Sequence, residues 1–108
     1  MMQRYGSVIR LKPEKQQEYK RLHAQVWPEV LKMIRQCNIR NYSIYYKDGL
    51  LFSYFEYHGD DFAADMRRMA ADPQTQAWWK LTDPCQEPLE SRQAGEWWAG
   101  MEEYFHVD

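Results

Sequence analysis

The stretch IRNYSIYYKDGLLFSYFEY, residues 39–57, decides the fold of this chain. Aromatic and β-branched residues, which favour strands, fill both of its halves, residues 39–47 and 50–57. Between the halves stands Asp48-Gly49, and an Asp-Gly pair favours a tight turn between antiparallel strands. The stretch therefore predicts a β-hairpin in the middle of the chain.

A strand and a long helix are predicted before the hairpin. Residues 3–11 carry β-branched and aromatic residues and are typical of a strand. Pro13 suits the first turn of a helix, and apolar residues at three- and four-residue steps continue that helix to about Cys37. Because Pro28 cannot bond back one turn, we expect the helix to kink near Trp27.

Two shorter helices are predicted after the hairpin. Asp60 is positioned to cap a helix over about 61–71, and Asp72-Pro73 begins another that ends near residue 82. Aspartate side chains accept hydrogen bonds from the free N–H groups at a helix start, and proline needs no partner there.

The end of the chain adds a loop and a last strand. Residues 83–95 hold two prolines and few apolar residues, so they predict a loop, and residues 98–107 predict a strand. The order β-α-β-β-α-β is the ferredoxin-like α+β arrangement, an antiparallel sheet with helices on one face. We expect residues 1–108 to form one domain, and a homodimer to cover the bare sheet face, with Tyr45 and Phe55 among its aromatic residues.

Composition and charge exclude several classes of function. The formal net charge is -2 without a strongly basic segment, which argues against a nucleic-acid partner. No apolar run approaches the roughly 20 residues of a membrane span, and the first residues lack the apolar core of a secretory signal. Cys37 and Cys85 stand far apart, which is typical of reduced thiols and predicts a cytoplasmic protein.

The sequence also lacks the motifs of cofactor and metal enzymes. It contains no GxGxxG, P-loop or GxSxG motif, and the spacing of His23, His58 and His106 is not that of metal ligands. We therefore expect neither a cofactor nor a metal.

Two polar-tipped rings lie on the apolar stripe of the first helix. Tyr19 and His23 are one turn apart, so they can converge on one ligand. Imidazole titrates near neutrality and can both donate and accept protons. The alternative is that His23 is a core histidine held by a hydrogen bond.

Further candidates come from the high aromatic content, 16% of the chain, because aromatic faces stack well on sugars. Trp78 and Trp79 point about 100° apart on a helix, which favours one ring in the core and one on a cleft wall. Trp97-Trp98 are assigned to packing.

Tyr42 has two possible orientations on its strand. Strand alternation places Tyr42 and Ile44 on one face and Ile39 on the other. Facing the helices, Tyr42 would meet the His23 stripe, and facing away it would join the dimer interface.

Taken together, these motifs resemble the L-rhamnose mutarotase family, and the resemblance spans nearly the whole chain. The matching motifs are Tyr19-x-x-x-His23, Trp27-Pro28-Glu29, Asn41-Tyr42-x-Ile44-Tyr45, Trp78-Trp79-Lys80 and Glu103-x-Phe105-His106. Residues 83–95 depart from the family pattern in length and sequence.

The resemblance implies a dimeric α/β barrel of ferredoxin-like subunits that interconverts the α and β anomers of L-rhamnose, or of a similar 6-deoxy sugar, without a cofactor. It implies that His23 is the proton donor and that Tyr19, Tyr42, Trp78 and Trp79 contact this monosaccharide.

Two other functions are compatible with the residues. Cofactor-free monooxygenases of the dimeric α/β-barrel type also carry a pocket histidine and tryptophans, and oxygen uptake with a quinol-type substrate would identify one. A non-catalytic sugar-binding module would bind a sugar but show no exchange of anomers.

Overall fold

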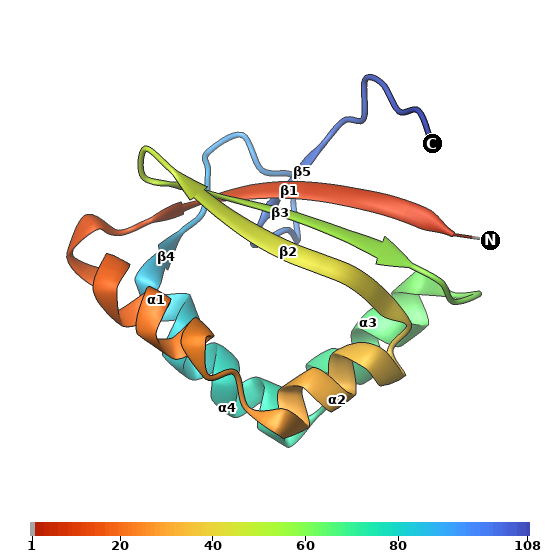
Figure 1. Ribbon diagram of the computed structural model, residues 1–108, viewed down its shortest axis with the longest axis horizontal. Helices are drawn as coiled ribbons and strands as arrows, with labels where there is room; N and C mark the ends of the chain where they lie inside the picture. The colour runs from red at the N-terminus through yellow and green to blue at the C-terminus, as the bar shows by residue number, and fades with distance from the viewer. Residues whose placement is uncertain (1) are drawn as a thin grey trace.

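The computed structural model describes residues 2–108, which form a curved antiparallel sheet with all helices on one side (Figure 1). Its central strands are neighbours in the order β2-β3-β1, and β4 and β5 both pair with β1. The α+β arrangement expected from the sequence is confirmed. The strands are β1 (Gln3–Leu11), β2 (Ile39–Lys47), β3 (Leu50–Tyr57), β4 (Gln86–Glu87) and β5 (Ala99–Met101).

The helices connect these strands and cover one face of the sheet, the lower face in Figure 1. Helix α4 packs against α2 and α3, and α1 lies against the turn that follows α4. No helix within residues 2–108 has the length and apolar character needed to cross a membrane. The helices are η1 (Pro13–Lys15), α1 (Gln16–Ala24), α2 (Pro28–Gln36), α3 (Phe62–Ala70), α4 (Pro73–Thr82) and η2 (Asp83–Cys85).

The predicted single, kinked helix is wrong, because the chain breaks into two helices. Helix α1 ends at Ala24, and Pro28 is the first residue of α2. Between them Gln25 has φ -142° and Trp27 has φ -60° and ψ 135°, outside helical geometry. A residue before proline is pushed towards extended backbone by the proline ring, so the helix stops before Trp27 rather than bending there.

One predicted cap is confirmed and the other is shifted by one residue. The Asp72 carboxylate accepts a hydrogen bond from the Thr75 N–H at 2.9 Å, as expected at the start of α4. At the start of α3 the cap is Asp61, not Asp60, and it accepts from the Ala64 N–H at 3.0 Å. Either aspartate suits this role, and the path of the turn after β3 selects the second.

The predicted strand over residues 98–107 is mostly wrong. Of these residues only β5 forms a strand, and it pairs with Gly6–Val8 of β1. Strand β4, which lies in the predicted loop 83–95, pairs with Arg10 and Leu11 of the same strand. Since β4 and β5 share one edge of β1, only the first residues of that edge remain for a longer strand. After Met101 the chain forms no further strand, and Tyr104 is 92% exposed.

A bulge in β2 changes which residues face the helices. Asn41 has φ 50°, and the register with β3 shifts between Arg40 and Ser43. Because a bulge adds one residue to one strand, Ile39 is buried opposite Tyr57 although Tyr42 also faces the helices. The prediction that Ile39 and Tyr42 lie on opposite faces is wrong for this reason.

The helix-facing side of the sheet also holds Phe55. Its ring stacks on Tyr5 at a centroid distance of 5.3 Å and lies 6.3 Å from Phe62 of α3. Phe55 is therefore not part of the bare face, contrary to the sequence prediction. Tyr45 does lie on the outer face and is 67% exposed.

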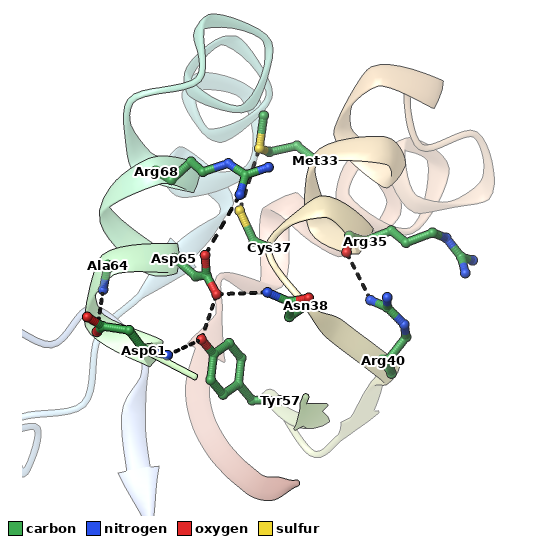
Figure 2. A network of polar contacts seen from close by, with 10 residues as sticks. All are labelled: Met33, Arg35, Cys37, Asn38, Arg40, Tyr57, Asp61, Ala64, Asp65 and Arg68. Carbon is green, nitrogen blue, oxygen red and sulfur yellow. Dashed lines mark hydrogen bonds and ion pairs between the residues drawn. The ribbon is translucent and has the colours of Figure 1, made fainter. Parts of the chain in front are cut away.

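A partly buried network ties α3 to the sheet and to the turn after α2 (Figure 2). The Tyr57 hydroxyl donates to Asp65 Oδ2 at 2.6 Å and accepts from the Asp61 N–H at 3.0 Å. Asn38 Nδ2 donates to the same Asp65 oxygen at 3.0 Å. These bonds favour the ionised carboxylate and lower the pKa of Asp65. They fix the far end of the helical layer, away from α1.

Candidate active site

Helix α1 presents Tyr19 and His23 towards the core, one turn apart. Their ring centroids are 4.2 Å apart with an interplanar angle of 31°. Tyr19 is only 5% exposed, and His23 is half-buried. The helical spacing therefore places the two polar-tipped rings together, as the sequence predicts.

A single hydrogen bond fixes the tautomer of His23. Its Nδ1 lies 2.9 Å from the backbone carbonyl oxygen of Tyr19. Because a carbonyl can only accept, Nδ1 is the donor, and the lone pair of a neutral imidazole is left on Nε2. Burial lowers the pKa of His23 below its ordinary value of 6.5, against the opposing effect of this hydrogen bond. At neutral pH the group is therefore a base.

Helix α4 supplies the aromatic wall beside the imidazole. The Trp78 ring meets His23 edge-on at 5.4 Å and meets Trp27 edge-on at 5.3 Å. Trp78 is buried, whereas Trp79 is 36% exposed, and within residues 2–108 its ring makes no aromatic contact. The two tryptophans thus divide into one core ring and one exposed ring, as expected from adjacent helix positions.

Tyr42 enters the site from the sheet. Its ring contacts Phe55 edge-on at 5.6 Å, so it lies on the side of the helices. Burial raises the pKa of its hydroxyl although the residue is 43% exposed. Tyr42 is therefore a partly exposed residue on the helix-facing side of the sheet.

Two residues that the sequence did not identify as functional form a series of hydrogen bonds that ends at Tyr19. Gln86 of β4 donates from Nε2 to the Tyr19 hydroxyl at 3.1 Å. Trp97, assigned above to packing, donates from its indole Nε1 to Gln86 Oε1 at 2.7 Å. The spacing of residues in the sequence does not indicate that Gln86 is buried, because both of its hydrogen-bond partners are more than ten residues away in the chain. Sequence patterns therefore carried no signal for it.

The chemistry available here is proton transfer and hydrogen bonding. Among residues 2–108 no group of three or more His, Cys, Asp or Glu side chains gathers as metal ligands would. On the same side of the sheet the hydroxyls of Ser7 and Ser53 bond to each other, so one hydroxyl hydrogen is left for another partner. A basic imidazole, phenols and flat aromatic faces suit a small polyol.

Comparison with known proteins agrees with this chemistry. The family model for L-rhamnose mutarotase matches residues 4–107. An L-rhamnose mutarotase of Phocaeicola vulgatus is 38% identical over 80 residues, which are 72% of this chain and 74% of that protein. One of Bacillus subtilis is 32% identical over 85 residues, 77% of this chain and 79% of that protein.

Solved structures show the same fold. An L-rhamnose mutarotase of Formosa agariphila superposes with a TM-score of 0.76 at 21% identity, covering 98% of this chain and 99% of that one. Tetracenomycin F2 cyclase of Streptomyces glaucescens, a polyketide cyclase, reaches 0.73 at 12% identity, with 98% and 97% covered. At these identities the likeness concerns the fold alone, whereas the family match extends along the sequence. This chain therefore belongs to the L-rhamnose mutarotase family.

Proposed function

We propose that His23 is the acid/base group with which this member of the L-rhamnose mutarotase family interconverts the α and β anomers of its sugar. The observation that carries the proposal is the hydrogen bond from His23 Nδ1 to the Tyr19 carbonyl. It leaves Nε2 as the one ring nitrogen that can exchange a proton with a ligand.

The proton balance of the reaction follows from a neutral imidazole. His23 Nε2 takes the proton of the anomeric hydroxyl, the C1–O5 bond breaks, and O5 takes up a proton from a neighbouring donor. The aldehyde turns about the C1–C2 bond. O5 then attacks the other face of C1 and releases its proton, while imidazolium returns the first proton to the carbonyl oxygen. His23 enters as a base and is the proton donor in ring closure.

The remaining candidates hold the sugar. We assign Trp78 and Trp79 to the apolar C–H faces of the pyranose and its methyl group, because flat aromatic faces bury such surface well. Tyr19 and Tyr42 contribute hydroxyls that orient sugar hydroxyls. The substrate proposed is L-rhamnose or a closely similar 6-deoxy monosaccharide.

We also propose that the protein is a homodimer joined through the outer face of the sheet. That face carries Val8, Phe52 and Tyr45 at directly paired positions of neighbouring strands, and Tyr45 is largely exposed. Apolar side chains on a sheet face that no helix covers are typical of an interaction surface. A cytoplasmic location is supported by Cys37 and Cys85, both buried free thiols of the kind a reducing compartment maintains.

The decisive experiment compares wild-type protein with His23→Asn by NMR saturation transfer between the anomers of L-rhamnose, L-fucose and other 6-deoxy sugars. His23→Asn keeps polarity and size but cannot cycle a proton, so we expect the exchange rate to fall by about a hundredfold or more. Sugar binding survives because the tryptophan walls remain.

The melting temperature is measured on the same His23→Asn sample. A variant that melts early but exchanges anomers at the wild-type rate would show that His23 is a core residue. Wild-type protein that binds the sugar without exchanging its anomers would instead indicate a sugar-binding module.

A further inference from the structure

We propose that Gln86, itself held by Trp97, positions the Tyr19 hydroxyl as the proton donor to the ring oxygen of the sugar. The inference rests on the proposed function, and it assigns Tyr19 as the second group that exchanges a proton with the sugar, beside His23. Gln86 and Trp97 are positioning residues in this reaction, and Tyr19 is the group that touches the substrate.

The direction of each hydrogen bond follows from the chemistry of the indole. The Trp97 Nε1–H can only donate, so the Gln86 atom at 2.7 Å must be the amide oxygen. The amide nitrogen is therefore the atom 3.1 Å from the Tyr19 hydroxyl, and it donates to the phenolic oxygen. Tyr19 receives a hydrogen bond and keeps its own hydrogen. Within residues 2–108 the Tyr19 hydroxyl makes no other hydrogen bond, so its hydrogen is available to a ligand.

Burial makes this arrangement rigid. Gln86 and Tyr19 are each 5% exposed, so water does not compete for their bond. A buried amide without partners is costly, and Gln86 loses its bond from the Trp97 indole N–H if it turns over. The backbone is fixed as well, because Gln86 pairs with Leu11 of β1 and Trp97 stands just before β5, which pairs with the same strand. Both ends of the intervening loop are thus anchored on one strand.

The direction of the hydrogen bonds from Trp97 to Gln86 and from Gln86 to Tyr19 suits proton donation by the Tyr19 hydroxyl. The Tyr19 and His23 ring centroids are 4.2 Å apart, so one sugar can contact both side chains. The phenol gives its proton to O5 as the C1–O5 bond breaks and recovers it when O5 attacks C1. In between, the Gln86 N–H stabilises the phenolate. Burial raises the pKa of Tyr19, and this N–H opposes the rise.

The sharpest test is Gln86→Glu, which keeps the shape of the side chain and reverses one bond. A carboxylate has only acceptors, so it retains the Trp97 bond but takes the Tyr19 hydrogen and repels a phenolate. We expect kcat for anomer exchange at pH 7 to fall at least about tenfold, the scale seen when one preorganised donor is lost, with a smaller change in KM. Gln74→Glu on the exposed surface of α4 adds the same charge and is the control.

A double-mutant cycle separates positioning from structure. In a Tyr19→Phe background there is no hydroxyl to misdirect, so Gln86→Glu produces no further loss of kcat. A purely structural effect of the buried charge would instead lower kcat by the same factor in both backgrounds and would overturn the inference.

A second variant covers the case in which Gln86→Glu does not fold. Trp97→Phe removes the N–H that fixes the amide orientation, so the amide can turn its oxygen towards Tyr19. We expect a loss of a few fold in kcat that is absent in the Tyr19→Phe background. If folded Gln86→Glu has the kcat of the wild-type protein, the inference is overturned. If Gln86→Glu does not fold, a wild-type kcat in Trp97→Phe overturns it. In both cases anomer exchange by the wild-type protein still supports the proposed function. Absence of exchange in wild-type protein would contradict the proposed function instead.

Discussion

His23 and Tyr19 are joined through the backbone as well as through their rings, because the imidazole Nδ1–H donates to the Tyr19 carbonyl oxygen at 2.9 Å. One turn of α1 therefore sets the ring orientation, the tautomer and the free nitrogen of the proposed base. The side chain is half-buried, so its ionisation also depends on its surroundings.

The first prediction concerns the pH profile of anomer exchange. Burial lowers the pKa of His23, so the neutral base predominates above pH 6.5 and is lost as the pH falls through the lower, folded value. We expect the acid limb of kcat/KM to have its midpoint below 6.5. A midpoint above 6.5 would contradict the assignment of His23 as the base.

The same shift affects stability. The unfolded chain binds a proton on His23 at higher pH than the folded chain does, so the free energy of unfolding falls as the pH is lowered from 6.5 through the folded pKa. His23→Asn lacks this group, and its unfolding free energy should depend less on pH in that interval. Denaturant unfolding at several pH values measures the difference.

The two tryptophans of α4 should respond differently to truncation. Trp78 is buried against His23 and Trp27, and Trp78→Ala should cost about 3–5 kcal/mol of unfolding free energy. Trp79 is partly exposed, and Trp79→Ala should cost about 1 kcal/mol or less but raise KM several-fold through the lost sugar face. Equal effects of both variants on the free energy of unfolding would contradict this difference in burial.

The network around Tyr57 should support stability without taking part in the reaction. Tyr57→Phe removes the donor to Asp65 and the acceptor for the Asp61 N–H, and should lower the unfolding free energy by about 1–3 kcal/mol. Tyr54→Phe, which loses one bond to Glu56 on the other sheet face, is the control and should cost about 0.5–1 kcal/mol. Both should keep the wild-type kcat, and a large loss in Tyr57→Phe would link this end of the fold to the site.

The proposed dimer is tested on its outer sheet face. Tyr45→Glu replaces an exposed aromatic ring of that face with a charge, which is costly to bury without a partner, so we expect dissociation at concentrations where wild-type protein is dimeric. Leu31→Glu, on the exposed surface of α2, serves as the control. Sedimentation of wild-type protein as a monomer at micromolar concentration would exclude the dimer.

Neither cysteine should be required for activity. Cys37 and Cys85 are fully buried, and burial raises the pKa of both thiols, which makes them poor nucleophiles. The double variant Cys37→Ser, Cys85→Ser should retain anomer exchange. It should melt at a lower temperature, because two more polar hydroxyls replace thiols in the core. A large loss of kcat in a folded double variant would show that a thiol takes part.

The local patterns of the chain were sufficient to predict the elements that depend on neighbouring residues. Asp48-Gly49 predicted the hairpin, and the four-residue spacing of Tyr19 and His23 predicted their contact, because both signals are contained within one turn. The bulge at Asn41 and the short β5 were missed, because each depends on which residues a neighbouring strand offers. The Gln86 bonds were missed for the same reason.

The shared edge of β1 has an evolutionary consequence. The loop after β4 leaves the sheet beside Arg10 and returns at β5 beside Val8, so both of its ends are held by the same strand, with only Ile9 between the two positions. Residues can be inserted or removed within it at little thermodynamic expense, because each doubling of the length of a flexible loop costs only about 0.6 kcal/mol. Gln86 and Trp97 stand at its two ends, so a change in loop length reaches the Tyr19 hydroxyl. This loop is therefore a place where the length of the chain can change while the fold stays constant.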